Sequence, residues 1–506
     1  MDKLATEAAA LKPLAVIVTF GALSVFYFVG LIIYRLYFHP LSHVPGPWYN
    51  KVSRLPHVRH IVVGTTVDSV KQLHDKYGDV VQISPNEVSF TSNTAWQDIY
   101  GFRTGKHKGH LNMQKDPVWY TRSPTGQSII TADDADHSRF RKVLAHAFSA
   151  QALAKQEDIL HRYVDLLVNR LKETLSTDER PQDMTEWYNW TTFDVIADLM
   201  FGEPFGCLQN RETHKYITLI FLSIRALRMG YIMSYYPWVK WFGNWIVDKK
   251  SLAGRKEYYN WVVSRTQTRM DRETQRPDFM TEVLKNNGKK DAELTTTEIY
   301  SNFGVLLTAG SETSATLLSG LTYLLGKNPE VHQKLKDEVR GRFKNFGDIN
   351  CKEVNDLPYL LAVLQEALRY FPPVPTGFER RVGPGGEFVS GCFIPANTAV
   401  CVSAYPAGHS ERNFKDSSLF VPERWLNDPR YAGDKKDSIQ PFSIGPRNCL
   451  GKNLAYTEMR LILAKMIWTF DMELDPKSAN WFDELKCMVL WNKPGLFVKV
   501  TEVARD

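Results

Sequence analysis

The feature that most constrains this chain is the segment FSIGPRNCLG at residues 442–451, which places one cysteine in a turn directly before a helix. Gly445 and Gly451 allow a tight turn and a close approach of the backbone to a flat ligand. Apolar residues recur with helical spacing over residues 454–470, so helix-start amides and the helix dipole would stabilise a thiolate at Cys449. Because thiolate is an axial ligand of haem, the segment predicts a haem-binding turn. The alternative for a lone cysteine is a buried structural residue.

Two neighbours of Cys449 favour the haem interpretation. Arg447 can donate a forked, charge-assisted hydrogen bond to a haem propionate, and Phe442 can pack beside the sulfur and limit the access of water. With Gly445 and Gly451, these residues match the pattern F-x-x-G-x-R-x-C-x-G at every fixed position. The chain therefore resembles the cytochrome P-450 superfamily. The resemblance implies a mainly α-helical fold with a smaller β portion, and haem b whose iron is bound by the Cys449 thiolate.

Composition limits the domain organisation, the metal sites and the partners that we expect. The chain has 506 residues, 43% of them hydrophobic, and no linker or repeat divides it, so we expect one large domain. Its six cysteines show no CxxC or zinc-like spacing, which argues against a disulfide framework and a second metal site. A net charge of +6 without a long basic run argues against nucleic acid as a partner.

The N-terminal region predicts a membrane anchor. Residues 14–34 contain no charged side chain and have the length of roughly 20 residues that crosses a bilayer as a helix. A cleaved signal peptide, the alternative, has a shorter apolar core and a small-residue cleavage site. We expect a short tail at residues 1–13, a transmembrane signal anchor at 14–34, a proline-rich, semi-rigid hinge at 35–56 and the catalytic domain at 57–506. The hinge resembles membrane-bound fungal members, which implies a single-pass protein of the endoplasmic reticulum membrane whose catalytic domain faces the cytosol.

A long helix is expected over residues 298–326. It begins at a capping box, and its centre reads AGSET at residues 309–313. An acid beside an alcohol suits proton transfer in an apolar pocket, whereas a mid-helix glycine also serves close helix packing. The superfamily pattern A-G-x-[DE]-T is matched in full. It implies that Thr313 and Glu312 are catalytic residues that deliver protons for oxygen activation, and that Ala309 and Gly310 leave room over the haem.

A set of charged residues is expected to support the cysteine turn. Glu366 and Arg369 share one face of a helix over residues 357–370, which by itself describes a solvated surface pair. The segment PERW at residues 422–425 adds Arg424. These elements resemble the E-x-x-R and P-E-R-F elements of the superfamily, with Trp425 in place of the more common Phe. The resemblance implies that Glu366, Arg369 and Arg424 form a buried structural ion network.

Three more residues are candidates for the haem propionates. Arg141 and His137 lie on one expected helix and resemble the W-x-x-x-R element, with His137 where Trp is often found. Arg380 matches a strand arginine of the superfamily, and Arg381 is the alternative by one position. Outside the resemblance, these side chains would be ordinary surface cations.

The motifs together predict a haem-thiolate monooxygenase that uses O2 to hydroxylate or otherwise oxidise an apolar small molecule. No dinucleotide, flavin or iron-sulfur motif is present, so electrons must come from a partner. The resemblance implies NADPH-cytochrome P-450 reductase, with cytochrome b5 as a second candidate, and Arg139, Lys142 and Lys452 are candidates for a basic docking patch. The alternatives are a haem-thiolate isomerase or dehydratase, which tends to lack the acid-alcohol pair, and a non-enzymatic membrane haem sensor.

No motif indicates the substrate. We expect residues 100–130 and 206–247 to line its pocket or entrance. The second segment is rich in aromatic rings, which either pack in the core or dip into the lipid interface: Tyr231, Tyr235, Tyr236, Trp238, Trp241, Phe242 and Trp245. Resemblance to fungal enzymes that tailor secondary metabolites favours a terpenoid, polyketide or alkaloid scaffold.

Overall fold

The computed structural model describes residues 2–105, 108–120, 126–242, 249–274, 276–289, 293–487 and 489–505. Its α-helices are α1 (Asp2–Ile33), α2 (Trp48–Val52), α3 (Leu55–Val63), α4 (Thr66–Tyr77), α5 (Asn93–Tyr100), α6 (Asp134–Leu144), α7 (Ala150–Lys155), α8 (Glu157–Leu175), α9 (Met184–Phe201), α10 (Cys207–Asn210), α11 (Lys215–Tyr235), α13 (Lys249–Met270), α14 (Phe279–Asn286), α15 (Thr296–Lys327), α16 (Pro329–Arg342), α17 (Pro358–Tyr370), α18 (Ala404–Gly408) and α19 (Lys452–Thr469). Its strands are β1 (Val80–Ser84), β2 (Glu87–Phe90), β3 (Gln114–Lys115), β4 (Gln182–Asp183), β5 (Arg380–Arg381), β6 (Glu387–Val389), β7 (Cys392–Ile394), β8 (Ala399–Val402), β9 (Phe470–Leu474), β10 (Lys486–Cys487), β11 (Trp491–Asn492) and β12 (Phe497–Glu502).

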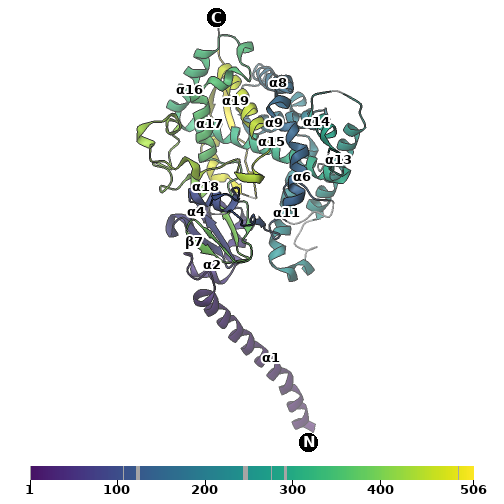
Figure 1. The fold of residues 1–506 in the computed structure, drawn as a ribbon, viewed down its shortest axis with the longest axis vertical. Coiled ribbons are helices and arrows are strands. Elements are labelled where there is room, and N and C mark those ends of the chain that lie inside the picture. The colour runs from purple at the N-terminus through teal and green to yellow at the C-terminus, as the bar shows by residue number, and fades with distance from the viewer. Residues whose placement is uncertain are drawn as a thin grey trace.

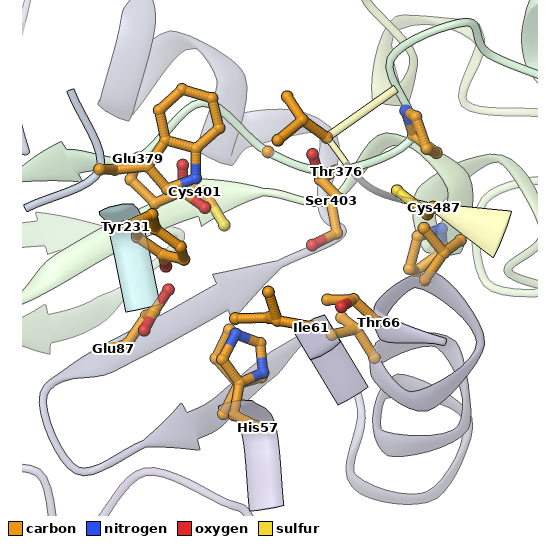
Figure 2. A pocket seen from close by; sticks show the side chains of 18 of the residues that line it. His57, Ile61, Thr66, Glu87, Tyr231, Thr376, Glu379, Cys401, Ser403 and Cys487 are labelled. Carbon is orange, nitrogen blue, oxygen red and sulfur yellow. The ribbon is translucent and has the colours of Figure 1, made fainter. Parts of the chain in front are cut away.

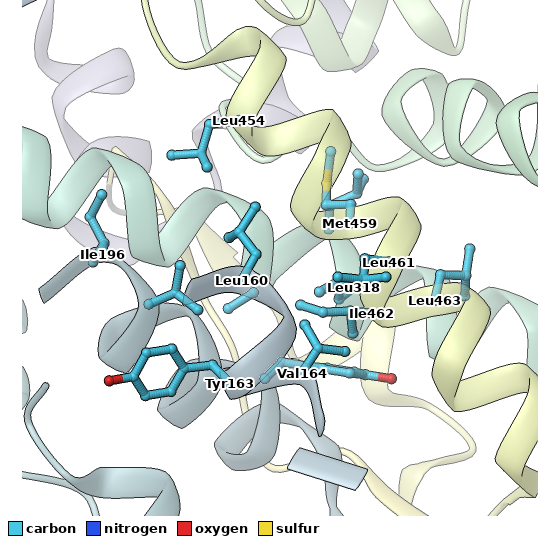
Figure 3. Close-up of a cluster of buried hydrophobic side chains, with 14 of the residues drawn as sticks. Leu160, Tyr163, Val164, Ile196, Leu318, Leu454, Met459, Leu461, Ile462 and Leu463 are labelled. Carbon is cyan, nitrogen blue, oxygen red and sulfur yellow. The ribbon is translucent and has the colours of Figure 1, made fainter. Parts of the chain in front are cut away.

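Helix α15 runs through the centre of the helical body and packs against α9, α13, α17 and α19 (Figure 1). Its start follows from a complete capping box between Thr295 and Glu298, and Asn328 ends it before Pro329 begins α16. The expectation of a helix over residues 298–326 is confirmed. Side chains of α8, α15 and α19, among them Leu160, Leu318 and Leu463, meet in the largest hydrophobic cluster (Figure 3).

A smaller β portion lies beside the helices. Its main sheet has the strand order β1-β2-β8-β5-β3, in which only β2 and β8 run parallel. A second sheet has the order β4-β12-β9. Within the main sheet, β3 pairs with β5 so that Lys115 lies opposite Arg380. The prediction of one large, mainly helical domain with a smaller β portion is confirmed.

The apolar N-terminal helix projects away from the body (Figure 1). A span at Ala15–Phe38 is long and apolar enough to cross a membrane, and none of it is buried against the domain. The helix continues beyond the expected end at residue 34 through a π-helical turn at Tyr34–Phe38.

The expected hinge at residues 35–56 is not a free spacer. Leu41 and Val44 are fully buried among the strands of the main sheet, and the amide of Gln82 donates to the carbonyl of Pro45 over 2.7 Å. The prolines interrupt the helix, but the apolar side chains between them gain more from burial against the sheet than from solvent exposure.

The aromatic segment near the C-terminal end of α11 divides into two parts. Tyr231, Tyr235 and Tyr236 are half-buried, and Tyr231 and Tyr236 pack on a small cluster that includes Val58 and Ile61 of α3. Trp238 and Trp241 are exposed by 59% and 86%. Within the described residues, one part of the segment thus packs on the domain and the other part is exposed. The side chain of Phe242 and all of Trp245 lie outside the described residues.

Candidate haem-thiolate site

Cys449 lies in the tight turn that its neighbours predict. Its amide donates to the carbonyl of Phe442 over 2.7 Å, which closes the turn. Gly445 has a φ of +74°, and a Cβ added there would lie 2.0 Å from the carbonyl oxygen of Tyr100. Conformation and space thus both demand glycine at position 445.

The Cys449 thiol faces accessible space within the fold. Its side chain is exposed, yet the protein atoms around it desolvate the sulfur and raise its pKa. The backbone amides of Gly451 and Lys452, at the start of α19, oppose that rise, as do the charges of Arg141 and Lys452. An added Cβ on Gly451 would meet only a ring carbon of Phe148, at 3.8 Å, so the protein leaves room beside the sulfur.

The centre of α15 presents two different faces. Ala309 is exposed and Thr313 half-buried, although residues on either side of them in the helix, such as Leu307 and Ser311, are buried, and the Thr313 hydroxyl donates to the Ala309 carbonyl over 2.8 Å. Ser314, the next residue, hydrogen-bonds Glu458 of α19, the helix that follows Cys449. This contact joins α15 to the helix that follows the cysteine turn.

Glu312 and Gly310 each contact another part of the protein. The Glu312 side chain is 1% exposed, and its Oε1 accepts from Lys493 and from the hydroxyl of Thr316 at 3.2 Å. A Cβ on Gly310 would lie 2.8 Å from Cδ1 of Ile196 in α9, so this glycine serves close helix packing. The structure therefore favours the packing interpretation of Gly310 over the expectation that it leaves room for a ligand.

Several positively charged side chains lie close to the cysteine turn. Arg380 is 6% exposed, and burial followed by repulsion from Arg447 lowers its pKa. Burial, then Arg380 and Arg447, lower the pKa of Lys115 well below its usual range. The pKa of His137 falls to about 3 through burial and the charges of Arg447, Lys115 and Arg141, so His137 is neutral at pH 7.

This cation cluster, Lys115, Arg141, Arg380 and Arg447 with neutral His137, holds more positive than negative charge. Asp134 forms an ion pair with Arg447 at 2.7 Å and is the acid that faces Lys115 and Arg380. In the described parts of the chain, Nε of Arg380 and Nη1 of Arg447 have no hydrogen-bond partner. Such a cluster fits a bound group that carries carboxylates.

Arg141 and Arg381 are held in other ways. Arg141 donates to the carbonyl and side-chain oxygens of Asn448 at 2.8 and 2.5 Å, and so braces the cysteine turn directly. Arg381 donates to Asp116 at 2.5 Å and to Asn397 at 2.8 Å. Within the described residues, Nε of Arg381 is unpartnered as well, but Asp116 balances its charge, so Arg380 rather than Arg381 adds uncompensated charge to the cation cluster.

Comparison with known proteins decides the family. A sequence model of the family Cytochrome P450 matches residues 45–500. The chain belongs to the cytochrome P450 family. Members of this family bind haem through a cysteine thiolate, and the accessible Cys449 beside an uncompensated cation cluster fits that cofactor.

Relatives of this P450 come from filamentous fungi. It is 55% identical to the cytochrome P450 monooxygenase traB of Penicillium crustosum, over 94% of both chains. Identity is 40% to the trichothecene C-15 hydroxylase of Fusarium sporotrichioides, over 94% of this chain and 96% of that one. It is 41% to the averantin hydroxylase of Dothistroma septosporum, over 93% of this chain and 88% of the relative.

The predicted ion network of this P450 is buried and larger than expected. Glu366, Arg369 and Arg424 are each 0% exposed, and Glu366 accepts from Arg369 at 2.7 and 3.0 Å and from Arg424 at 3.1 Å. The indole of Trp425 also donates to Glu366, at 2.9 Å, and Asp434 pairs with Arg424. Two acids thus balance two arginines and join α17 to the chain segment that leads into the cysteine turn.

A second cysteine, Cys351, lies in a separate cluster with Glu157 and His161 of α8. Lys465 approaches Nδ1 of His161 at 3.4 Å, and an ammonium can only donate there. The other ring nitrogen, Nε2, faces Glu157 at 3.4 Å and Cys351 at 3.9 Å. Burial raises the pKa of Cys351 to about 12, so this cluster does not offer a thiolate.

One expected partner contact is wrong in part. Arg139 does not belong to an exposed docking patch, because it donates to Asp136 and Glu298, each at 2.7 Å. Glu298 at the start of α15 neutralises its charge. Lys142 and Lys452 are exposed, as a docking patch requires.

Proposed function

We propose that this protein is a monooxygenase of fungal secondary metabolism that oxidises an apolar small molecule at a haem bound by Cys449. The observation that carries the proposal is the accessible Cys449 thiol, with the amides of Gly451 and Lys452 directed at its sulfur and the unbalanced cation cluster beside its turn. The names of the relatives support the reaction class.

The cation cluster would hold the haem propionates. Arg380 and Arg447 have unpartnered nitrogens for them, and Lys115 adds charge. Arg141 and neutral His137 would act mainly through the cysteine turn and the packing around it. When bound, the haem supplies the reductive activation of dioxygen. The protein contributes the thiolate, the orientation, the exclusion of water and the protons.

Proton supply rests on α15. Thr313 offers a half-buried hydroxyl whose proton is donated to the Ala309 carbonyl, so its oxygen is left to accept a hydrogen bond from a proton donor in the site. Lys493 and Thr316 hold Glu312 through one carboxylate oxygen, and within the described residues the other oxygen has no hydrogen-bond partner. That second oxygen would exchange protons with the site while Lys493 keeps the carboxylate in place.

Family membership implies a redox partner and a small-molecule substrate. We propose NADPH-cytochrome P-450 reductase as that partner, with cytochrome b5 as an auxiliary donor and Lys142 and Lys452 at the contact. The apolar span at Ala15–Phe38 would anchor the protein in the endoplasmic reticulum membrane, with the domain in the cytosol. Exposed Trp238 and Trp241 would then rest in the lipid interface.

Reconstitution of the haem-loaded protein with the reductase tests this function. The protein is incubated with a panel of apolar fungal terpenoids, polyketides and alkaloids under ¹⁸O2, and products are read by mass spectrometry. We expect a product with one ¹⁸O atom that requires NADPH and reductase and falls strongly in Thr313→Val but not in Thr313→Ser. Product formation without NADPH would indicate an isomerase or dehydratase, and ligand binding without any product would indicate a sensor.

A further inference from the structure

A second feature of the core concerns the substrate. A cavity of about 210 Å³ lies between α3, α4, the end of α11 and the segment before β5 (Figure 2). These elements lie at the end of the molecule from which α1 leaves (Figure 1). Tyr120, in the cavity wall, is close enough to Arg380 and Arg447 to feel their charge. The cavity therefore adjoins the cation cluster on the anchor side.

Most of the cavity wall is apolar, and its size limits what it holds. Ile61, Val67, Val70, Ile83 and Val489 form much of the wall. Pockets that enclose a drug-sized ligand are usually about 300–1,000 Å³, so this cavity suits one end of such a molecule.

Two acids interrupt the apolar wall. Figure 2 shows Glu87 and Glu379 at the same end of the cavity, with Tyr231 beside them. Glu87 is 1% exposed and Glu379 7%. Within the described residues, Oε1 of Glu87 and Oε2 of Glu379 have no hydrogen-bond partner. Buried polar atoms are rarely left unpaired, so these two oxygens indicate a ligand group that binds between them.

The two acids differ in what they can offer. Arg54 pairs with Glu87, and Ser84 donates to the same oxygen at 2.9 Å, so Glu87 is an ionised acceptor with one free oxygen. Burial, followed by the charges of Glu87 and Asp116, raises the pKa of Glu379 well above its usual range. Protonated Glu379 can donate as well as accept.

We propose that this cavity binds the polar end of an otherwise apolar substrate, and that Glu87 and Glu379 select a hydroxyl or secondary amide there. Such a group donates to Oε1 of Glu87 and accepts from Glu379, and the apolar remainder extends toward the cysteine turn. The inference rests on the proposed function, since it assigns the substrate of that same site. It makes Glu379 a specificity-determining residue.

Matched ligands test the inference on the haem-loaded, full-length protein in phospholipid nanodiscs. The probes are ω-phenylalkan-1-ols of increasing chain length and their methyl ethers, which keep the acceptor and lose the donor. Dissociation constants come from calorimetry, with empty nanodiscs as the reference for partitioning. We expect the wild type to bind the best alcohol about tenfold more tightly than its ether, as one net hydrogen bond provides.

Three variants test whether the cavity acids cause the preference for the alcohol over the ether. Glu87→Leu should abolish the preference for the alcohol, because it removes the acceptor that only the alcohol can use, and Glu87→Gln, whose amide oxygen still accepts, should retain it. Glu179→Leu is the matched control, because Glu179 is exposed and does not line the cavity. It should bind both probes as the wild type does. The inference is wrong if the wild type binds the alcohol and the ether of every pair equally, or if Glu87→Leu still prefers the alcohol.

A second measurement keeps the inference testable if Glu87→Leu does not fold. The infrared band of the protonated Glu379 carboxyl, assigned by its loss in Glu379→Gln, should shift with the alcohol and with the ether, which both accept from it, and not with the phenylalkane of matched length. Equal spectra with the ether and the phenylalkane would contradict the proposal. The carbon monoxide spectrum is recorded for every sample, so loss of thiolate ligation, which would overturn the proposed function, is distinguished from loss of substrate selection.

Discussion

Two buried groups of charged side chains lie within this core, and they are built in opposite ways. The network of Glu366, Arg369, Arg424 and Asp434 matches two acids with two arginines, and backbone carbonyls of Gly408, Ser417 and Leu419 accept from Arg369. The cation cluster around Arg380 and Arg447 has several cations and one acid, with guanidinium nitrogens left unpaired.

The difference in charge balance distinguishes a group that stabilises the fold from a group that binds a ligand. A balanced, fully hydrogen-bonded network has nothing to offer a ligand, and breaking it leaves an uncompensated buried charge. An unbalanced cluster is unfavourable by itself and becomes favourable only with an anionic partner. The two groups should therefore respond in opposite ways to the loss of a charge.

The largest effect is expected in the balanced network. Glu366→Ala removes the acid shared by Arg369, Arg424 and Trp425, and should destabilise the protein by about 3–5 kcal/mol, the usual result of breaking a buried pair. Chemical denaturation followed by tryptophan fluorescence measures this. Glu353→Ala breaks only the surface pair with Arg342 and should change stability by less than about 1 kcal/mol. Equal effects of the two substitutions would contradict the comparison.

Loss of a cation from the cluster should weaken the hold on haem rather than the fold. Arg380→Leu removes an unpartnered donor, and a charge-assisted hydrogen bond of about 1.5–3 kcal/mol predicts haem release roughly ten to a hundred times faster. Transfer of haem to apomyoglobin measures the rate. Arg381→Leu is the neighbouring control and should lower stability through Asp116 while leaving haem release unchanged. The reverse pattern would assign the propionate to Arg381.

Glu458 is a buried acid with no cationic partner in the described structure. It tests, for a negative charge, the argument that an uncompensated buried charge is unfavourable. Burial raises its pKa to about 8, against a hydrogen bond from Ser314. Between about pH 4.5 and pH 8 the folded state keeps a proton that the unfolded state releases, so stability falls as pH rises through that window. Relative to wild type, Glu458→Gln should gain about 1 kcal/mol between pH 6 and pH 7. A pH-independent difference would show that Glu458 is ionised in the fold.

The smallest effect is expected at exposed cations. Lys142→Glu with Lys452→Glu should raise the reductase concentration needed for half-maximal turnover by about threefold to tenfold at low salt, and less at high salt. Lys477→Glu with Lys499→Glu, an exposed pair near and within β12, is the control for net charge. If both double variants behave alike, the two lysines do not form the docking patch.

What the sequence could predict depends on how local the signal is. The turn around Cys449 and the bounds of α15 follow from glycines, caps and periodicity within a few residues. Lys115, Lys493 and Glu379 act through partners far away along the chain, and no short motif marks them. Pairing of β3 with β5 brings Lys115 to Arg380, and only the folded sheet shows it.

The predictions that changed did so for the same reason. Arg139 looked exposed beside Lys142 in the sequence, but Glu298 at the start of α15 lies within reach of it. Gly310 fitted a ligand motif, yet its neighbour in the fold is Ile196 of α9. In both cases a residue more than 100 positions away decides the role, and sequence spacing contains no information about it.

The central claim is that Cys449 supplies the thiolate that binds haem, and the carbon monoxide difference spectrum of the reduced protein tests it most directly. Wild type should show the red-shifted Soret band for which the family is named, and Cys449→Ala should lose it while Cys351→Ala retains it. An unshifted band in folded wild-type protein, or a shifted band that survives in Cys449→Ala, would contradict the account.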